Sequence, residues 1–197
     1  MEITEKRKKI MTAAAATFAK YGYKKTTIDE IVAVAGISKG LFYHYYENKT
    51  QIYLHLYNTY VDIMADTIHQ KIDMTETDFI ERLKTISHIR IAFINDYPDL
   101  WEFLYSAYYE QHPDIAPLIK EKNNLLVKDS FQHSAANIDW SQLRSDITPN
   151  QAIMMVTWMA EGFVRRLNFE EITSDKNLYQ EFDCYIDFLK NGLYQYI

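Results

Sequence analysis

The chain contains few of the residues that interrupt helices. Among its 197 residues there are only five glycines and four prolines, and none of them lies between Leu41 and Tyr97. Strands and tight turns depend on such residues far more than helices do, so this scarcity argues for long helices. We therefore expect an all-α fold.

Cysteine is nearly absent as well. The single residue, Cys184, cannot form an internal disulfide or a thiolate metal site, and we expect it to be a small buried hydrophobe. The six histidines form no H-x-H or H-x-x-x-H pair, and the chain has no Gly-rich phosphate loop and no G-x-S-x-G motif. We expect no metal ion, no cofactor and no enzymatic activity. A helical enzyme assembled from distant residues is the remote alternative.

Long apolar runs are missing too. No stretch approaches 18 uninterrupted apolar residues, and no apolar segment of useful length follows the basic residues of the N-terminus. Hydrophobic residues make up 48% of the chain and charged residues 24%, which is ordinary for a globular protein with one substantial core or two small ones. We expect a cytoplasmic protein with no membrane partner.

The net charge of −6 is unevenly distributed. Residues 1–50 contain nine Lys/Arg and five Asp/Glu, a balance of +4, while the remainder contains twelve and twenty-two, a balance of −10. A basic N-terminal quarter on an acidic body is typical of a protein that meets phosphate at one end only. The basic arm from Lys6 to Lys9 could lie along a DNA backbone, or it could be the solvated start of a helix.

Two short helices joined by a tight turn are predicted between residues 27 and 46. Thr27 and Glu30 have the spacing of a capping box, so a helix should begin at Ile28 and end at Gly36, which tolerates a positive φ. Ser38 is a good N-cap for a second helix that runs from Lys39 to about residue 46. This is the helix-turn-helix pattern, in which the second helix enters the major groove of DNA.

The second helix of this pair separates into two faces. The four-residue spacing of Phe42 and Tyr46 indicates core packing. Tyr43 and His44 fall on other faces, and each taken singly could be ordinary solvated surface. A glycine inside a helix, Gly40, costs roughly 1 kcal/mol relative to alanine, which is reasonable if a DNA backbone must come close.

Many residue types in this region recur in the register of one known family. The stretch from about Ile10 to Ile52 resembles the N-terminal DNA-binding domain of the TetR/AcrR family of bacterial transcriptional regulators. The resemblance rests on Phe18-Ala19, Gly22-Tyr23, Thr26-Thr27-Ile28, Ile31, Ala33, Ala35-Gly36-Ile37-Ser38-Lys39-Gly40, Phe42-Tyr43, Tyr45-Tyr46 and Lys49. Tyr46 stands where the family usually has Phe, a conservative change if its hydroxyl finds water or a partner.

The resemblance implies a DNA-binding domain at residues 1–48 and a helical effector-binding and dimerisation domain at residues 49–197. Lys39 and Gly40 would contact bases or adjacent phosphates, Tyr43 and Lys49 would hold phosphates, and His44 would face the groove. With the two helix-flanking residues included, the predicted DNA-binding residues are Thr27, Ser38, Lys39, Gly40, Tyr43, His44 and Lys49.

Apolar spacing and caps predict about nine helices in all. Pro98 should open one of them, while Pro113 and Pro117 should break the chain before the next. The predicted helices outside the helix-turn-helix pair cover residues 10–21, 49–70, 79–97, 100–112, 119–136, 148–169 and 174–196. Trp140, in a polar connection, is expected to pack back onto the body.

The last two helices are more apolar than a small body needs, so we predict that they pair with their copies in a four-helix homodimer interface. The alternative is that both simply complete the monomer core. A dimer would place two recognition helices on successive major-groove faces and so predicts a palindromic operator. The predicted interface residues are Met159, Phe163, Leu178, Phe182, Tyr185, Leu189 and Leu193.

A pocket for a small effector is also predicted, although aromatic stripes at helical spacing are more often core. Such a pocket would suit a large hydrophobic or a cationic compound. Its predicted residues are Trp101, Tyr105, Tyr108, Tyr109, Met155, Trp158, Met159 and Glu161. Together these predictions describe a homodimeric repressor that an effector releases from DNA; an architectural or regulatory DNA-binding factor without an effector is the alternative.

Overall fold

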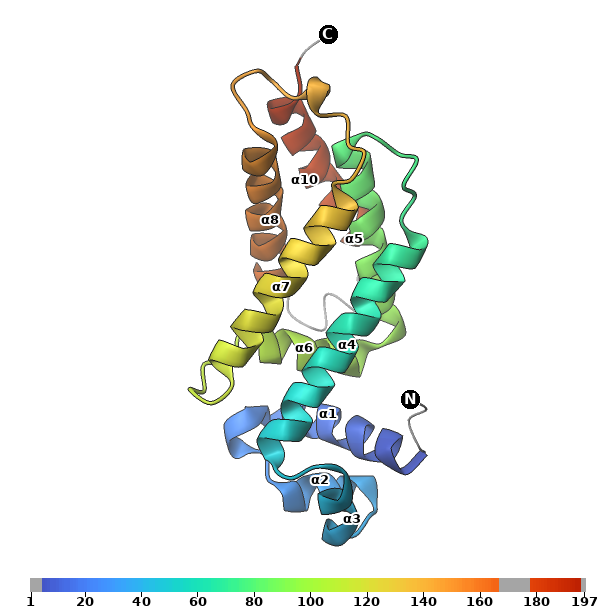
Figure 1. Ribbon diagram of the computed structural model, residues 1–197, viewed down its shortest axis with the longest axis vertical. Helices are drawn as coiled ribbons and strands as arrows, with labels where there is room; N and C mark the ends of the chain where they lie inside the picture. Colours follow the sequence, from blue (N-terminus) through green and yellow to red (C-terminus); the bar gives the residue numbers. More distant parts are fainter. Residues whose placement is uncertain (1–4, 167–177, 196–197) are drawn as a thin grey trace. The chain divides into compact units, whose positions relative to one another are not determined.

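The computed structural model describes residues 5–166 and 178–195, and this part of the chain is helical as predicted (Figure 1). It contains nine α-helices and one short 3-10 helix, Trp140–Gln142. No helix in the described part combines the length and apolar character needed to cross a membrane. The α-helices are α1 Glu5–Lys25, α2 Ile28–Ala35, α3 Lys39–Tyr45, α4 Lys49–Lys71, α5 Phe79–Asp96, α6 Pro98–Tyr108, α7 Ala116–Ser134, α8 Pro149–Arg166 and α10 Leu178–Leu193.

The chain divides into two compact units. The first consists of Met1–Asp66 and Tyr97–Asp129, and the second of Thr67–Asp96 and Ser130–Ile197. The first unit therefore contains α1 to α3 together with most of α4, all of α6 and the first part of α7. The division of function after residue 48 stays a prediction.

Aromatic rings form the centre of the first unit. The ring of Tyr53 on α4 lies 4.8 Å from that of Phe18 on α1 and 5.2 Å from that of Phe103 on α6, both edge to face. All three side chains are fully or almost fully buried. Such ring pairs contribute about 0.5–1.5 kcal/mol each beyond their burial, so α1, α4 and α6 are held as one packed group.

The second unit packs α10 against both α5 and α8, and Ile80, Ile86, Val156 and Ile186 are buried there. The ring centroid of Trp140 lies 5.0 Å from that of Phe79 on α5. This contact confirms that the polar connection containing Trp140 packs back onto the helical body.

Arg82 is an unpredicted buried charge in this second unit. Only 2% of its surface is exposed. Its guanidinium donates to the carbonyl oxygens of Ser134 at 3.0 Å, Ala136 at 2.5 Å, Met74 at 3.4 Å and Glu76. Arg82 thereby supplies donors to the end of α7 and to the connection before α5, where backbone acceptors would otherwise be unpaired.

Three local predictions need correction. Cys184 is exposed rather than buried, because it lies on the outer side of α10. α6 ends at Tyr108 rather than at His112, since the carboxylate of Glu110 accepts the N–H groups of Gln111 and His112 and turns the chain there. Pro117 does not break α7 but sits in its first turn, where its missing N–H is not needed.

Candidate DNA-binding surface

The predicted caps shape α2 as expected. The Thr27 hydroxyl accepts the Glu30 N–H at 3.2 Å, and a Glu30 carboxylate oxygen accepts the Thr27 N–H at 2.7 Å, which completes the capping box. Gly36 has φ of 63° and donates to the Ala33 carbonyl at 3.3 Å. Ile37 then donates to the Val32 carbonyl at 3.1 Å, so the chain reverses sharply into α3.

α3 begins where its sequence predicts. The Ser38 hydroxyl accepts the Leu41 N–H at 3.2 Å as an N-cap. A Cβ at Gly40 would come no closer than 4.0 Å to another side chain, that of Ser38. Among the described residues, no atom therefore excludes a larger side chain at this exposed position.

The two faces of α3 are separated as predicted. Phe42 and the following Tyr46 are buried, with 0% and 2% of their surface exposed. Tyr43 is 48% exposed and His44 is exposed. The first two side chains anchor α3 to its unit, and the other two remain accessible on its outer surface.

Lys39 forms an ion pair that the sequence did not predict. Its Nζ lies 2.7 Å from a carboxylate oxygen of Asp29 on α2, across the turn, and both side chains are exposed. The hydrogen bond that the Lys39 ammonium donates to Asp29 raises the pKa of Lys39, so the side chain stays cationic. A DNA phosphate or base would have to compete with Asp29 for this ammonium group.

Lys49 was predicted to hold a DNA phosphate, but its ammonium group also contacts residues within the protein. Its Nζ donates to the carbonyl oxygens of Tyr23 at 2.8 Å and Thr26 at 2.9 Å, and it lies 4.4 Å from the centre of the Tyr23 ring. Burial lowers the pKa of Lys49. The lysine thus ties the start of α4 to the α1–α2 connection with two of its three N–H groups, while its contact with phosphate stays a prediction.

The buried hydroxyl of Tyr46 has a hydrogen-bond partner within the protein, so a tyrosine is accommodated at this core position. Arg7 donates from Nε to this hydroxyl at 3.3 Å, and another of its guanidinium nitrogens lies 3.0 Å from His55 Nε2. Burial raises the pKa of Tyr46, and the hydrogen bond from Arg7 opposes that rise. One residue of the basic N-terminal arm is therefore engaged within the unit.

The predicted pocket residues fall into two groups. Those on α6 form a row of rings in the first unit, with centroid separations of 6.3 Å for Trp101–Tyr105 and 5.0 Å for both Tyr105–Tyr109 and Tyr108–Tyr109. Those on α8 belong to the second unit, where Met155, Trp158 and Glu161 are exposed and Met159 is partly buried.

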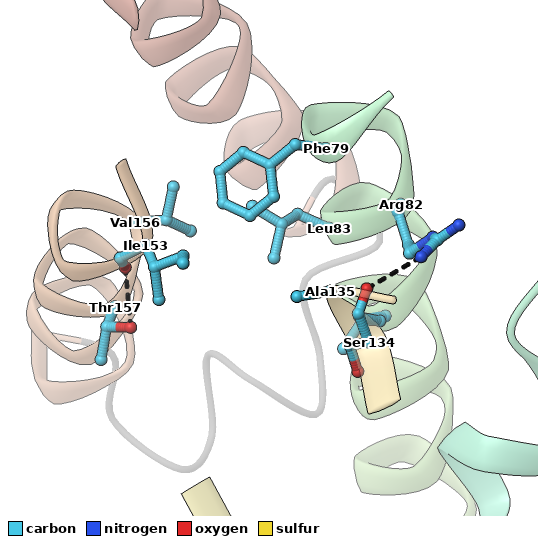
Figure 2. Close-up of a pocket in the computed structure, with 9 residues that line it drawn as sticks. Phe79, Arg82, Leu83, Ser134, Ala135, Ile153, Val156 and Thr157 are labelled. Carbon is cyan, nitrogen blue, oxygen red and sulfur yellow. Dashed lines mark hydrogen bonds between the residues drawn. The ribbon is translucent and has the colours of Figure 1, made fainter. Parts of the chain in front are cut away.

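A cavity of about 70 Å³ lies in the second unit and involves none of these eight residues. Figure 2 shows Phe79 and Leu83 of α5 pointing toward Ile153 and Val156 of α8 around it. Its wall is completed by Arg82, Ile86, Ser134, Ala135 and Thr157.

The predicted interface residues divide between interior and surface. Phe163, Leu178, Phe182 and Leu193 are at most 8% exposed in a single chain, and Met159 and Leu189 are partly buried. Tyr185 is 40% exposed. The most accessible large apolar side chains nearby are Trp158 on α8, at 60%, and Phe188 on α10, at 77%, and neither is among the predicted interface residues.

Comparison with known proteins agrees with this geometry. Residues 10–56 match the family model described as bacterial regulatory proteins, tetR family. The transcriptional activator FasR of Mycolicibacterium smegmatis is 28% identical over 116 residues, which are 59% of this chain and 52% of FasR. The chain thus spans about half the length of this relative.

Two solved structures share the fold over nearly the whole chain. The fatty acid degradation regulator FadR of Bacillus halodurans is 17% identical with a TM-score of 0.74, and the match covers 98% of each chain. SmeT, the repressor of a multidrug efflux pump in Stenotrophomonas maltophilia, was solved in complex with triclosan. That complex is 16% identical with a TM-score of 0.72 and covers 98% of this chain and 93% of SmeT.

The capped helix-turn-helix, the family match at residues 10–56 and the shared fold lead to one conclusion. Residues 10–56 match the tetR family of bacterial regulatory proteins, a non-enzymatic family of DNA-binding transcriptional regulators, and the chain shares the fold of solved TetR-family regulators over almost its whole length.

Proposed function

We propose that this regulator acts as a homodimeric repressor that binds a palindromic operator and is released by a small-molecule effector. The observation that carries the proposal is the outer surface of α3, where Lys39, Tyr43 and His44 are exposed beside an unobstructed Gly40. These residue types supply a cation, a phenol and an imidazole along the outer surface of the proposed recognition helix.

The roles within this surface follow from chemistry and exposure. Lys39 suits contact with base edges, because the first residues of a recognition helix enter the groove. His44, in the last turn of α3, would face the groove. The Tyr43 hydroxyl and the third N–H of Lys49 suit phosphate oxygens. Thr27 and Ser38 have hydroxyls engaged in capping, so they position the helices while their backbone groups remain near the DNA.

Dimerisation is supported by the exposed apolar side chains of α8 and α10. Met155 and Trp158 on α8 and Tyr185 and Phe188 on α10 are all at least 40% exposed. Large apolar groups gathered on two neighbouring helices mark an association surface more often than a solvated one. A two-fold pairing through them presents two copies of α3 to DNA.

Effector binding is supported by two features. The second unit holds an apolar cavity, and the structurally similar SmeT has been solved with triclosan. The aromatic row in the first unit and, separately, Met155, Trp158, Met159 and Glu161 of α8 in the second unit remain proposed contacts for hydrophobic or cationic compounds. A thermal-shift screen of hydrophobic cations and fatty acyl compounds should find at least one that raises the unfolding temperature. If none does, the regulator without an effector is favoured.

Selection of bound fragments from a random DNA pool tests the central proposal. We expect enrichment of an inverted repeat whose half-sites are about one helical turn apart, or a multiple of that. Repeating the selection with compounds from the thermal screen should release the DNA. Enrichment of a site without two-fold symmetry would contradict the dimeric mode of binding.

Tyr43→Phe tests the phosphate contact. Loss of one charge-assisted hydrogen bond costs about 1.5–3 kcal/mol, so we expect affinity to fall by about tenfold or more. The fall should be similar for the operator and for unrelated DNA, because phosphate contacts carry no sequence information. Tyr21→Phe is the matched control, since Tyr21 is 43% exposed against 48% for Tyr43 but lies on α1. A change confined to operator preference would show that Tyr43 reads bases instead.

A further inference from the structure

Two histidines far apart in sequence meet in the second unit. His69 lies in the last turn of α4 and His133 in the last turn of α7. Their ring centroids are 4.2 Å apart and the rings are tilted by 44°. The Nε2 atoms of both rings are buried and have no hydrogen-bond partner in the protein.

The two buried Nε2 atoms need a bonding partner. A buried polar atom that makes no hydrogen bond costs about 1–3 kcal/mol, and here two such atoms occur on adjacent rings. In the tautomer with its proton on Nδ1, a neutral imidazole presents a lone pair at Nε2. Two neighbouring lone pairs can be satisfied together by one cation that binds imidazole nitrogen.

The helix C-termini around the two histidines favour a bound cation, whereas the nearby Arg82 opposes it. Both histidines sit in the last turn of a helix, where the helix dipole has its negative end. Arg82, whose guanidinium donates to the carbonyl of Ser134 next in the chain to His133, adds positive charge to the same region. Only an ion with strong affinity for imidazole can offset that repulsion, which excludes Mg²⁺ and Ca²⁺, since these ions select oxygen ligands.

We propose that His69 and His133 form a two-imidazole site for a divalent transition-metal ion of the Zn²⁺ or Cu²⁺ class. Within the described residues no group of three or more His, Cys, Asp or Glu side chains could hold a metal, so water would complete the coordination. The ion would bridge the ends of α4 and α7. This site is independent of the proposed DNA and effector binding.

Calorimetric titration of the full chain, prepared without a polyhistidine tag, tests the site. We expect Zn²⁺ and Cu²⁺ to bind at one ion per chain at about pH 7.5, with Cu²⁺ tighter, and Mg²⁺ to give no signal. Each bound ion should also raise the unfolding temperature, because it binds the folded state only.

Substitutions locate the ion. His69→Gln and His133→Gln should each abolish the binding and the thermal shift, whereas His88→Gln should keep both, since His88 pairs with Asp183 elsewhere in the unit. Failure of the unaltered chain to bind either ion overturns the proposal. Binding that persists in both the His69 and the His133 variants overturns it as well.

A variant that gains a spectroscopic signal distinguishes loss of the metal site from misfolding of the glutamine variants. In a Cys184→Ser background, His133→Cys keeps a ligand at the same place and gives it a thiolate. Co²⁺ should then produce a thiolate-to-metal absorption band, which should disappear when His69→Gln is added. A band that is absent from the first variant, or unchanged in the second, contradicts a site shared by these two residues.

Discussion

At the scale of single residues, the burial of Tyr46 explains why three polar side chains gather at one place. A buried phenol needs a hydrogen-bond partner, and Arg7 supplies it while also contacting His55 on α4. His55 is consequently close to a permanent cation. Burial, and secondarily the Arg7 charge, lowers the pKa of His55 from its ordinary value of 6.5.

This lowered pKa predicts a pH-dependent stability. The unfolded chain takes up a proton at His55 near pH 6.5 while the folded chain resists it, so protonation favours unfolding. The contribution of His55 is complete above about pH 6.5 and decreases as the pH falls below that value. Urea unfolding at several pH values should show a smaller loss of stability on acidification for His55→Gln than for the unaltered chain. His44→Gln, the same change on the exposed surface of α3, is the control.

The residue scale also shows which contacts a sequence can predict. Caps such as Thr27, Gly36 and Ser38 act on groups within a few residues, so their roles were predicted correctly. The Asp29–Lys39 ion pair and the carbonyl contacts of Lys49 join residues from different elements. Opposite charges on either side of the turn were the only available signal for the first, and nothing in the spacing indicated the second.

At the scale of elements, the apolar character of α8 and α10 serves two purposes. Phe163 and Phe182 face inward, with ring centroids 5.2 Å apart, and close the unit. Trp158 and Phe188 face outward. Heptad-like spacing alone could not separate these groups, because a helix that is apolar on most sides gives no indication of which side its own chain covers.

The outward-facing side chains Trp158 and Phe188 predict the effect of one substitution on dimerisation. Phe188→Glu places a charge at the most exposed apolar side chain of the described residues, and an interface residue of this kind is typically worth about 2 kcal/mol or more. We expect the dimer dissociation constant to rise by about 30-fold or more, measured by sedimentation equilibrium. Leu125→Glu on α7, at a residue 60% exposed in the first unit, is the control. Unchanged association in Phe188→Glu would place the interface on another surface.

At the scale of the whole molecule, the fold class and the helix order could be predicted because helix boundaries are local. Gly22, for example, interrupts α1 with a φ of 73°, and Pro98 opens α6. The assignment of helices to the two compact units could not be predicted from the sequence. α6 packs with α1 through Phe103 and Phe18, a contact between residues far apart in sequence, and so belongs to the same unit as the helix-turn-helix.

The charge asymmetry of the chain and its proposed two-fold symmetry together predict a salt dependence. The logarithm of the DNA association constant should fall linearly with the logarithm of salt concentration, with a slope of about −0.9 for each neutralised phosphate. A full palindrome engages two basic N-terminal regions and a single half-site only one. The slope for the palindrome should therefore be about twice that for a half-site duplex. Phe188→Glu, held as a monomer, should give the half-site slope on both DNAs. Equal slopes for the unaltered chain on the two duplexes would mean that only one recognition helix engages DNA at a time.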